Sequence, residues 1–439
     1  MAPDRTEPVN SVNPHYLDHV VAVGESHGVE ASVDIVAGNG TKLLSRGARI
    51  DAVVRERLLQ HKLRQPLEDC VRVIGGVIPE RFGPIAERLL ERHPVLRALC
   101  AVAHVQPVPA SLVKLRLSVP MQSLLTVYCE HKEDQLEHTV GVSMLALALA
   151  RRLLPGEIER HRTLAMAGLV HDVGELYIDP QCLRPGARVG PREWKHIVTH
   201  PVVGHRVLRD MVGAGAGIAE AVLNHHERLD GFGYPRGIGG DALALDGQIL
   251  AAAEWLMALV DSGRAPLLRA SVATRLILGE FNPAVLHELA VAAQLAQEAQ
   301  ESPPSPAALE DAVPRVLRIA GTLRRFHELQ GWILERIEEA SPALKPTLDI
   351  GMDRMLRIQK AFSMTGLDAH NPQLLLRELA ALQDPAVHVE VLAVLRELEW
   401  RLRELEREQL WRAGLLPDPE CAVVCTLIDR LKGVGPGTV

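Results

Sequence analysis

Aromatic side chains and long apolar runs are scarce in this sequence of 439 residues. Phe, Trp and Tyr together make up 3% of the residues, whereas 47% are hydrophobic, with Leu, Ala and Val prominent. A sheet protein of this size would contain more aromatic residues, so the composition predicts a mainly α fold. The length is sufficient for two to three domains.

A basic surface is also missing. The net charge is -7, which gives no electrostatic footprint for duplex DNA or RNA. No run approaches the roughly 18 apolar residues of a membrane span, and the start of the chain lacks the basic and apolar regions of a signal peptide. These absences predict a cytoplasmic protein without a membrane span and without a duplex nucleic acid as partner.

The six cysteines follow no spacing that indicates a disulfide framework. Cys421 and Cys425 lie four residues apart, but no second pair accompanies them to complete a zinc site. Scattered cysteines in a long chain are typical of a reducing compartment.

Histidines and carboxylates form the most informative pattern. His171 and Asp172 directly follow the apolar run 164–170, which places two kinds of metal ligand at one helix end. A second pair, His225 and His226, stands further along the chain. An aspartate can bridge two cations, and such a pair of cations activates water and holds a phosphate oxygen. The pattern therefore indicates a metallohydrolase, for which His138, His200 and Asp134 are further candidate ligands.

The sequence around these residues resembles the HD-GYP domain, a subgroup of the HD metal-dependent phosphohydrolases whose best-known activity is hydrolysis of the bacterial second messenger cyclic di-GMP. The resemblance covers roughly residues 122–297. It rests on the histidine motifs, on the segment 225–235 (HHERLDGFGYP), and on matches that occur in the family's order: Ile178-Asp179-Pro180, Pro185-Gly186, Glu193-Trp194, His200-Pro201 and Gly204.

The resemblance implies an all-helical domain with two divalent metals, iron or manganese, and a cyclic dinucleotide as substrate. His171 and Asp172 would be the catalytic pair, with Asp172 bridging the metals. The implied metal ligands are His138, His171, Asp172, His200, His225 and His226, with Glu254 at the position of the carboxylate that closes the first site. Asp134 corresponds to a Glu that serves a third metal in some members, although a helix N-terminal charge partner is the alternative interpretation.

The substrate contacts implied by the resemblance lie partly in the glycine-rich segment. Tyr234 would line one wall of the substrate cleft. Arg236 follows it either as a phosphate contact or as a solvated loop arginine.

Three departures from the family pattern alter charge or geometry near the substrate. Glu175 stands where the family usually has a Lys that contacts phosphate, although a surface position indifferent to charge is the alternative. Glu254 replaces an Asp and adds a methylene. Met257 replaces an acidic residue, and the basic residue expected further on is represented only by Arg264, one place out of register. Three functions therefore stay open: a cyclic di-GMP phosphodiesterase, a sensor or adaptor that binds metal or nucleotide without turnover, and a phosphohydrolase for another nucleotide.

Turn and linker signals divide the chain into four parts. Residues 1–120 form a small mixed α/β module, in which Gly38-Asn39-Gly40 predicts a hairpin between 33–36 and 42–44, followed by a helix over 51–63. Residues 121–298 form the HD-GYP-like domain, with helices expected at 134–154, 161–170, 192–212, 218–226, 248–261 and after Pro283. A Pro- and Ser-rich linker spans 299–310, and a helical C-terminal region covers 311–439.

The C-terminal region contains an apolar stripe that alternates with charged residues. The stripe consists of Val391, Leu395, Leu398, Leu402 and Leu405, and its flanking charges include Glu397 and Arg401. Two heptads are too few to specify a coiled coil, so packing within a helical bundle is favoured. A homodimer or a protein partner bound through this stripe is the alternative.

Overall fold

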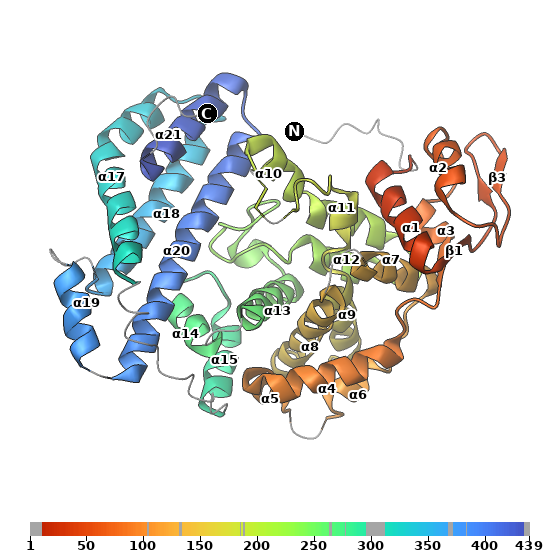
Figure 1. The fold of residues 1–439 in the computed structure, drawn as a ribbon, viewed down its shortest axis with the longest axis horizontal. Coiled ribbons are helices and arrows are strands. Elements are labelled where there is room, and N and C mark those ends of the chain that lie inside the picture. The colour runs from red at the N-terminus through yellow and green to blue at the C-terminus, as the bar shows by residue number, and fades with distance from the viewer. Residues whose placement is uncertain are drawn as a thin grey trace. The chain divides into compact units, whose positions relative to one another are not determined.

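The computed structural model describes residues 11–433 apart from 103–104, 131–133, 185, 188, 263–265, 277, 296–311, 368–371 and 383. It contains two compact units, one formed by residues 1–187 and 199–261 and the other by 188–198 and 262–439. Helices dominate both units, which confirms the mainly α fold class (Figure 1). The linker predicted at 299–310 lies outside the described residues, and the predicted domain limits stay a prediction.

The first unit begins with a small mixed module, as the sequence predicts. Its elements are α1 (Pro14–Ser26), β1 (Gly28–Ala31), β2 (Ile35–Val36), β3 (Lys42–Leu44), α2 (Ala52–Leu59), α3 (Leu67–Cys70) and β4 (Val71–Ile74). Antiparallel pairing of β2 with β3 confirms the hairpin, and Asp51 caps α2 by accepting a hydrogen bond from the backbone N–H of Val53. The sequence analysis did not anticipate α1 or the antiparallel pair of β1 with β4.

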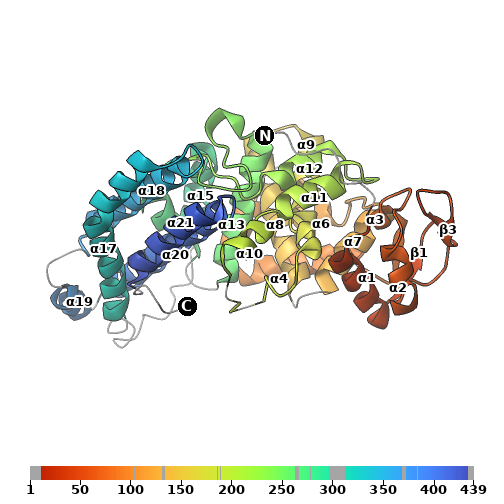
Figure 2. The ribbon, with the colours of Figure 1, turned by 90° about the horizontal axis from the view of Figure 1, so that it is seen from above.

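The core of the first unit surrounds the middle of one long helix. The helices here are α4 (Phe82–Arg92), α5 (Pro94–Cys100), α6 (Val108–Leu112), α7 (Val119–Glu130), α8 (Gln135–Leu153), α9 (Ile158–Val170), α11 (His200–Arg209), α12 (Ala216–Leu223) and α13 (Leu245–Asp261). All residues of α8 from Thr139 to Ala150 are buried, as expected for a helix that is apolar on every side. Helix α8 packs against α9 and α13 (Figure 2), and α12 packs against α9, α11 and α13.

The expectation of one helix over 192–212 was wrong. The structure has two helices in this segment, α10 (Pro191–Ile197) in the second unit and α11 in the first. Pro201 explains the interruption, because it has no N–H to donate to the carbonyl of Ile197 and its ring disfavours helical backbone before it. As a result, His200 stands at the very start of a new helix.

The second unit is a helical bundle. Besides α10 it contains α14 (Pro266–Leu276), α15 (Pro283–Leu295), α17 (Ala312–Glu339), α18 (Lys345–Met364), α19 (Pro372–Ala381), α20 (Pro385–Ala413) and α21 (Asp418–Lys432). Helix α20 packs against α14, α17, α18 and α21. Leu395, Leu398 and Leu405 of the apolar stripe are buried in the core of this bundle, which confirms the favoured interpretation. The homodimer stays a prediction.

Two charges predicted to flank that stripe are buried instead. Glu397 and Arg401 of α20 are each 1% exposed. Arg401 donates to Glu397 Oε1 at 2.9 Å and also bonds the carboxylate of Glu280, which lies between α14 and α15. A buried charge is tolerated only when it is paired and hydrogen-bonded, so this triad fixes the segment around Glu280 against α20.

None of the six cysteines forms a disulfide bond. No described helix is both long enough and apolar enough to cross a membrane.

Candidate metal centre

Among the residues that the structure describes, seven side chains with metal-binding atoms form two groups in the first unit. One group consists of His138, His171 and Glu254, and the other of Asp172, His200, His225 and His226; within each group the ligand atoms all lie within 4.8 Å of one another. Helices α8, α9, α11, α12 and α13 carry these residues or end just before them. The fold thus brings together six predicted ligands and the Glu254 carboxylate. The sequence alone did not show whether the Glu254 side chain reaches the other ligands.

Asp172 faces both groups at once. Its Oδ2 atom lies 3.2 Å from Nε2 of His171, whereas its Oδ1 atom lies 3.2 Å from Nε2 of His200 and 3.1 Å from Nε2 of His225. Asp172 follows the last residue of α9 closely, so the end of that helix sets its position. A carboxylate with one oxygen toward each group has the geometry needed to bridge two cations.

Backbone hydrogen bonds orient two of the imidazole rings toward the centre. Nδ1 of His171 lies 2.8 Å from the carbonyl oxygen of Gly168, and Nδ1 of His225 lies 2.6 Å from that of Val222. A ring nitrogen facing a carbonyl must donate, so in the neutral ring the lone pair belongs to Nε2. Metal-binding histidines are held in this way in many proteins.

The inward atoms of the first group fit a cation. Nε2 of His171 and Oε2 of Glu254 lie 3.2 Å apart, and both are buried without a hydrogen-bond partner among the described residues. Burying such atoms unsatisfied costs about 1–3 kcal/mol each. In the second group, the Nε2 atoms of His200 and His225 face each other at 3.2 Å. A cation in each group would satisfy these nitrogen and oxygen atoms, so the residues present suit divalent metals.

The electrostatic field of the centre favours cations. Burial alone would raise the pKa of the Asp172 carboxyl, but the positive charge of His171 and the close approach of the His171, His200 and His225 rings outweigh it and hold that pKa well below its usual value. The pKa of Glu254 is likewise well below its usual value, because His171 and His138 outweigh burial. Conversely, Asp172 and Glu254 raise the pKa of His171 against the effect of burial. A field that holds a proton on His171 equally attracts a metal cation.

Asp261 supports the first group from α13 and was missed by the sequence analysis. Its Oδ2 atom lies 2.7 Å from Nδ1 of His138, while Nε2 of His138 lies 3.2 Å from Oε2 of Glu254. Burial lowers the pKa of His138, but Asp261 and Glu254 outweigh it and raise that pKa to about 10. A carboxylate behind a ligating histidine orients the ring and strengthens it as a ligand. The signal was available, since Asp261 lies two helical turns after Glu254 on the same face.

Tyr128 is a second residue that the sequence analysis missed. This tyrosine of α7 is 1% exposed, and its hydroxyl donates to Oδ2 of Asp172 at 3.4 Å. The amide of Gln135 donates in turn to the Tyr128 hydroxyl oxygen. Burial, followed by the charges of Asp172 and Glu175, raises the pKa of Tyr128 well above its ordinary value, so this hydroxyl stays a donor. No spacing in the sequence connects α7 with Asp172.

The glycine-rich segment after His226 folds back onto the histidine pair. The Tyr234 ring stacks on the His226 ring, with centroids 4.5 Å apart and planes 30° apart. Buried Glu227 holds the segment by accepting hydrogen bonds from the backbone N–H groups of Arg236 at 2.8 Å and Ile238 at 3.1 Å. A Cβ atom at Gly233 would overlap the backbone of residues 226–228, so this close return requires glycine.

The remaining predicted site residues lie outside the two groups. The guanidinium of Arg236 bonds Asn224 and Glu220 of the α12 region. Asp134 is exposed and directly precedes α8, one turn before His138. Arg264 lies outside the described residues. The substrate roles of Tyr234, Arg236, Glu175 and Arg264, and a third metal at Asp134, stay predictions.

Met257 has a clear packing role. It is fully buried on α13, and a Cβ atom at Gly141 of α8 would overlap its side chain. An acidic residue at this position would bring an unpaired charge into the contact between these helices, which explains why a thioether is compatible with the fold.

Comparison with protein families identifies the arrangement. A family model described as "HD domain" matches residues 121–278, the part of the chain that carries all seven ligand candidates. The chain contains an HD domain. The prediction of an HD-type domain is thereby confirmed, together with its all-helical fold.

Several curated proteins are similar in sequence to parts of this chain. The chain is 40% identical over 110 residues to cyclic di-GMP phosphodiesterase PA4108 of Pseudomonas aeruginosa. The matched segment makes up 25% of this chain and 26% of the relative. The chain is 34% identical over 126 residues to 3'3'-cGAMP-specific phosphodiesterase 1 of Vibrio cholerae, 29% of each. A longer match, 25% identical over 230 residues, joins 51% of this chain to 50% of 3'3'-cGAMP-specific phosphodiesterase 3 of the same organism. The chain thus spans a quarter to a half of the length of these relatives.

Proposed function

We propose that this protein hydrolyses a phosphodiester bond of a cyclic dinucleotide, with cyclic di-GMP as the substrate and two divalent metals, iron or manganese, as cofactors. The observation that carries the proposal is the position of Asp172, whose two oxygens face separate groups of ligands. The names of relatives support the substrate class, since they include both cyclic di-GMP and 3'3'-cGAMP phosphodiesterases.

The chain's own residues have distinct parts in this reaction. His138, His171 and Glu254 would hold one metal, and His200, His225 and His226 the other, with Asp172 shared. Two such metals supply an activated water and neutralise charge on the phosphate. In the balanced reaction, water adds to phosphorus, the bond from phosphorus to the 3' oxygen breaks, and that oxygen gains a proton. Tyr128 keeps Asp172 oriented through its hydroxyl, and Tyr234 stacks on His226, where it would lie beside the reacting phosphate.

The direct test is metal content and turnover measured on the same anaerobically purified sample. We expect about two metals per chain, together with release of linear dinucleotide or mononucleotide from cyclic di-GMP. Parallel assays with 3'3'-cGAMP would show which cyclic dinucleotide is preferred. Two metals with no turnover of either nucleotide would overturn the proposal and favour the sensor or adaptor.

Glu175 favours the sensor or adaptor. Its negative charge lies near Tyr128 and Asp172, at a position where the resemblance implies a lysine that contacts the substrate phosphate. We expect Glu175→Lys to raise kcat/KM for cyclic di-GMP by about 10- to 100-fold, the range of one charge-assisted hydrogen bond to phosphate. Glu175→Gln should fall between the wild type and the lysine variant. Steady-state kinetics on the metal-loaded proteins measure this effect.

Glu159→Lys is the matched control, since the Glu159 side chain on α9 is 80% exposed and the substitution changes charge equally. A gain in both lysine variants would indicate general attraction of the anion. No gain in Glu175→Lys would show that this position does not limit substrate binding.

A further inference from the structure

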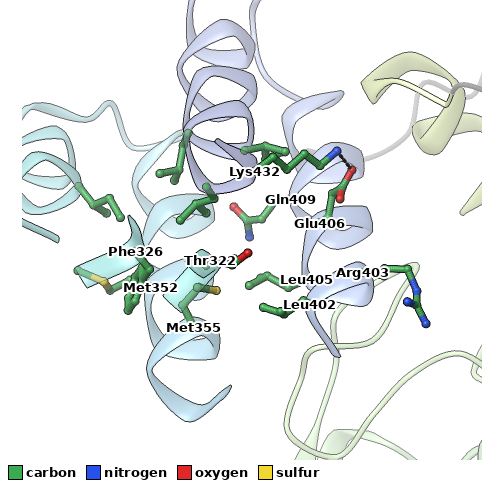
Figure 3. Close-up of a pocket in the computed structure, with 15 residues that line it drawn as sticks. Thr322, Phe326, Met352, Met355, Leu402, Arg403, Leu405, Glu406, Gln409 and Lys432 are labelled. Carbon is green, nitrogen blue, oxygen red and sulfur yellow. Dashed lines mark hydrogen bonds and ion pairs between the residues drawn. The ribbon is translucent and has the colours of Figure 1, made fainter. Parts of the chain in front are cut away.

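The second unit contains a pocket that has no part in the proposed hydrolysis. It has a volume of about 180 Å³ and lies among α17, α18, α20 and α21 (Figure 3). Its walls are largely apolar, and they include Phe326, Met352, Met355, Leu405 and Ile428. An apolar cavity of about 150 Å³ accommodates a benzene ring, so this pocket has room for a small ring compound. The two methionines can adapt to its outline.

One polar side chain is placed among these apolar walls. Gln409 of α20 is 4% exposed, and its amide points toward the middle of the pocket (Figure 3). Both its Oε1 and its Nε2 atoms are buried without a hydrogen-bond partner among the described residues. A buried amide with neither its donor nor its acceptor satisfied is costly for the fold. Such an arrangement points to a partner that is not part of the chain.

The charges at the pocket exclude a phosphorylated ligand. Lys432 of α21 lines the pocket but pairs with Glu406 of α20. With Lys432 paired and the guanidinium of Arg403 pointing away from the pocket (Figure 3), little positive charge is left for a phosphate group, which binds strongly to unpaired Lys or Arg. A ligand that fits this pocket would therefore be uncharged over most of its surface, and Gln409 would be the polar group that recognises it.

We propose that this pocket binds a small planar, mostly apolar ring compound that carries a neighbouring N–H and C=O, such as a cyclic amide. The Gln409 amide presents its acceptor and its donor side by side. It can accept a hydrogen bond from the ring N–H and donate one to the ring carbonyl. The ring then contacts the walls formed by Phe326, Met352 and Met355.

The test uses 2-quinolinone as the probe and N-methyl-2-quinolinone, which lacks the N–H donor, as its control. Calorimetric titration of the full chain is expected to show at least about tenfold tighter binding of 2-quinolinone, the effect of about one buried hydrogen bond. Gln409→Met keeps the side-chain length but removes the amide, and it should abolish the preference. The same variant should raise Tm by about 2–4 °C, because an unsatisfied buried amide is gone.

Gln359→Met on α18 is the matched control, since Gln359 does not line the pocket, and it should keep the preference of the wild type. Equal binding of both compounds, or an unchanged preference in Gln409→Met, would overturn the assignment of Gln409. Failure of the wild type to bind 2-quinolinone up to its solubility limit, with Gln409→Met folded and more stable, would overturn the ligand class.

Discussion

Asp172→Ala is expected to remove both metals and to lower hydrolysis of cyclic di-GMP by at least about 10³-fold. The physical reason is that Asp172 is the one described residue with an oxygen facing each ligand group. Its removal takes an anion from both groups, and His171, His200 and His225 each lose a carboxylate neighbour. Each cation would then have one protein ligand fewer and less negative charge to balance its own.

Metal analysis after dialysis and steady-state kinetics measure these two effects. Asp179→Ala is the matched control, because Asp179 lies nearby in the chain but caps a turn by accepting from the N–H of Gln181 at 2.9 Å. Both proteins should retain the helical circular dichroism spectrum of the wild type. If Asp172→Ala kept two metals per chain, the bridging role would be wrong, whatever the activity.

Glu254→Ala is expected to remove one metal and leave the other, with turnover reduced by at least about 10²-fold. Glu254 contacts His138 and His171 at 3.2 Å each and belongs to that group alone. The group of Asp172, His200, His225 and His226 keeps all its members in this variant. A chain that contains one metal has lost the pair of cations needed to activate water and hold phosphate together.

The shorter Glu254→Asp tests whether the extra methylene matters. It withdraws the carboxylate by about 1.5 Å, so we expect an occupancy of the first group between those of the wild type and Glu254→Ala. Glu137→Ala serves as the control, since Glu137 neighbours His138 in the chain but pairs with Arg92. Loss of both metals in Glu254→Ala would show that the two groups are not separable.

Local sequence signals predicted those elements whose structure depends on residues that are close together in the sequence. Gly38-Asn39-Gly40 predicts the hairpin of β2 and β3, and the apolar period in the C-terminal region predicts α20. Strands β1 and β4 pair although they lie about forty residues apart in the sequence, and a pattern of neighbouring residues cannot predict such a contact. The burial of Glu397 and Arg401 could not be predicted either, because the second carboxylate that pairs with Arg401, Glu280, is distant in the sequence.

In the candidate metal centre, too, some residues could be predicted from the sequence and others could not. Adjacent pairs such as His171 with Asp172 and His225 with His226 are visible as motifs, and a resemblance to a family gathers the scattered ligands. Tyr128 could not be found, because a lone tyrosine in an apolar helix has no signature and acquires its role from the position of Asp172. Asp261 could have been found from its helical register with Glu254. The substrate contacts need a bound nucleotide, which no pattern of residues in the chain supplies.

The buried triad of Glu280, Glu397 and Arg401 has a practical consequence for dissecting the protein. A fragment cut at residue 298, as the sequence pattern suggests, would keep Glu280 and discard Arg401. The discarded part would then hold an arginine deprived of one of its two carboxylates, a defect that costs about 3–5 kcal/mol when the pair is buried. Segments joined by such an ion pair should be expressed together. A boundary before α14 keeps Glu280 with Arg401, but it separates α10 from the rest of the second unit.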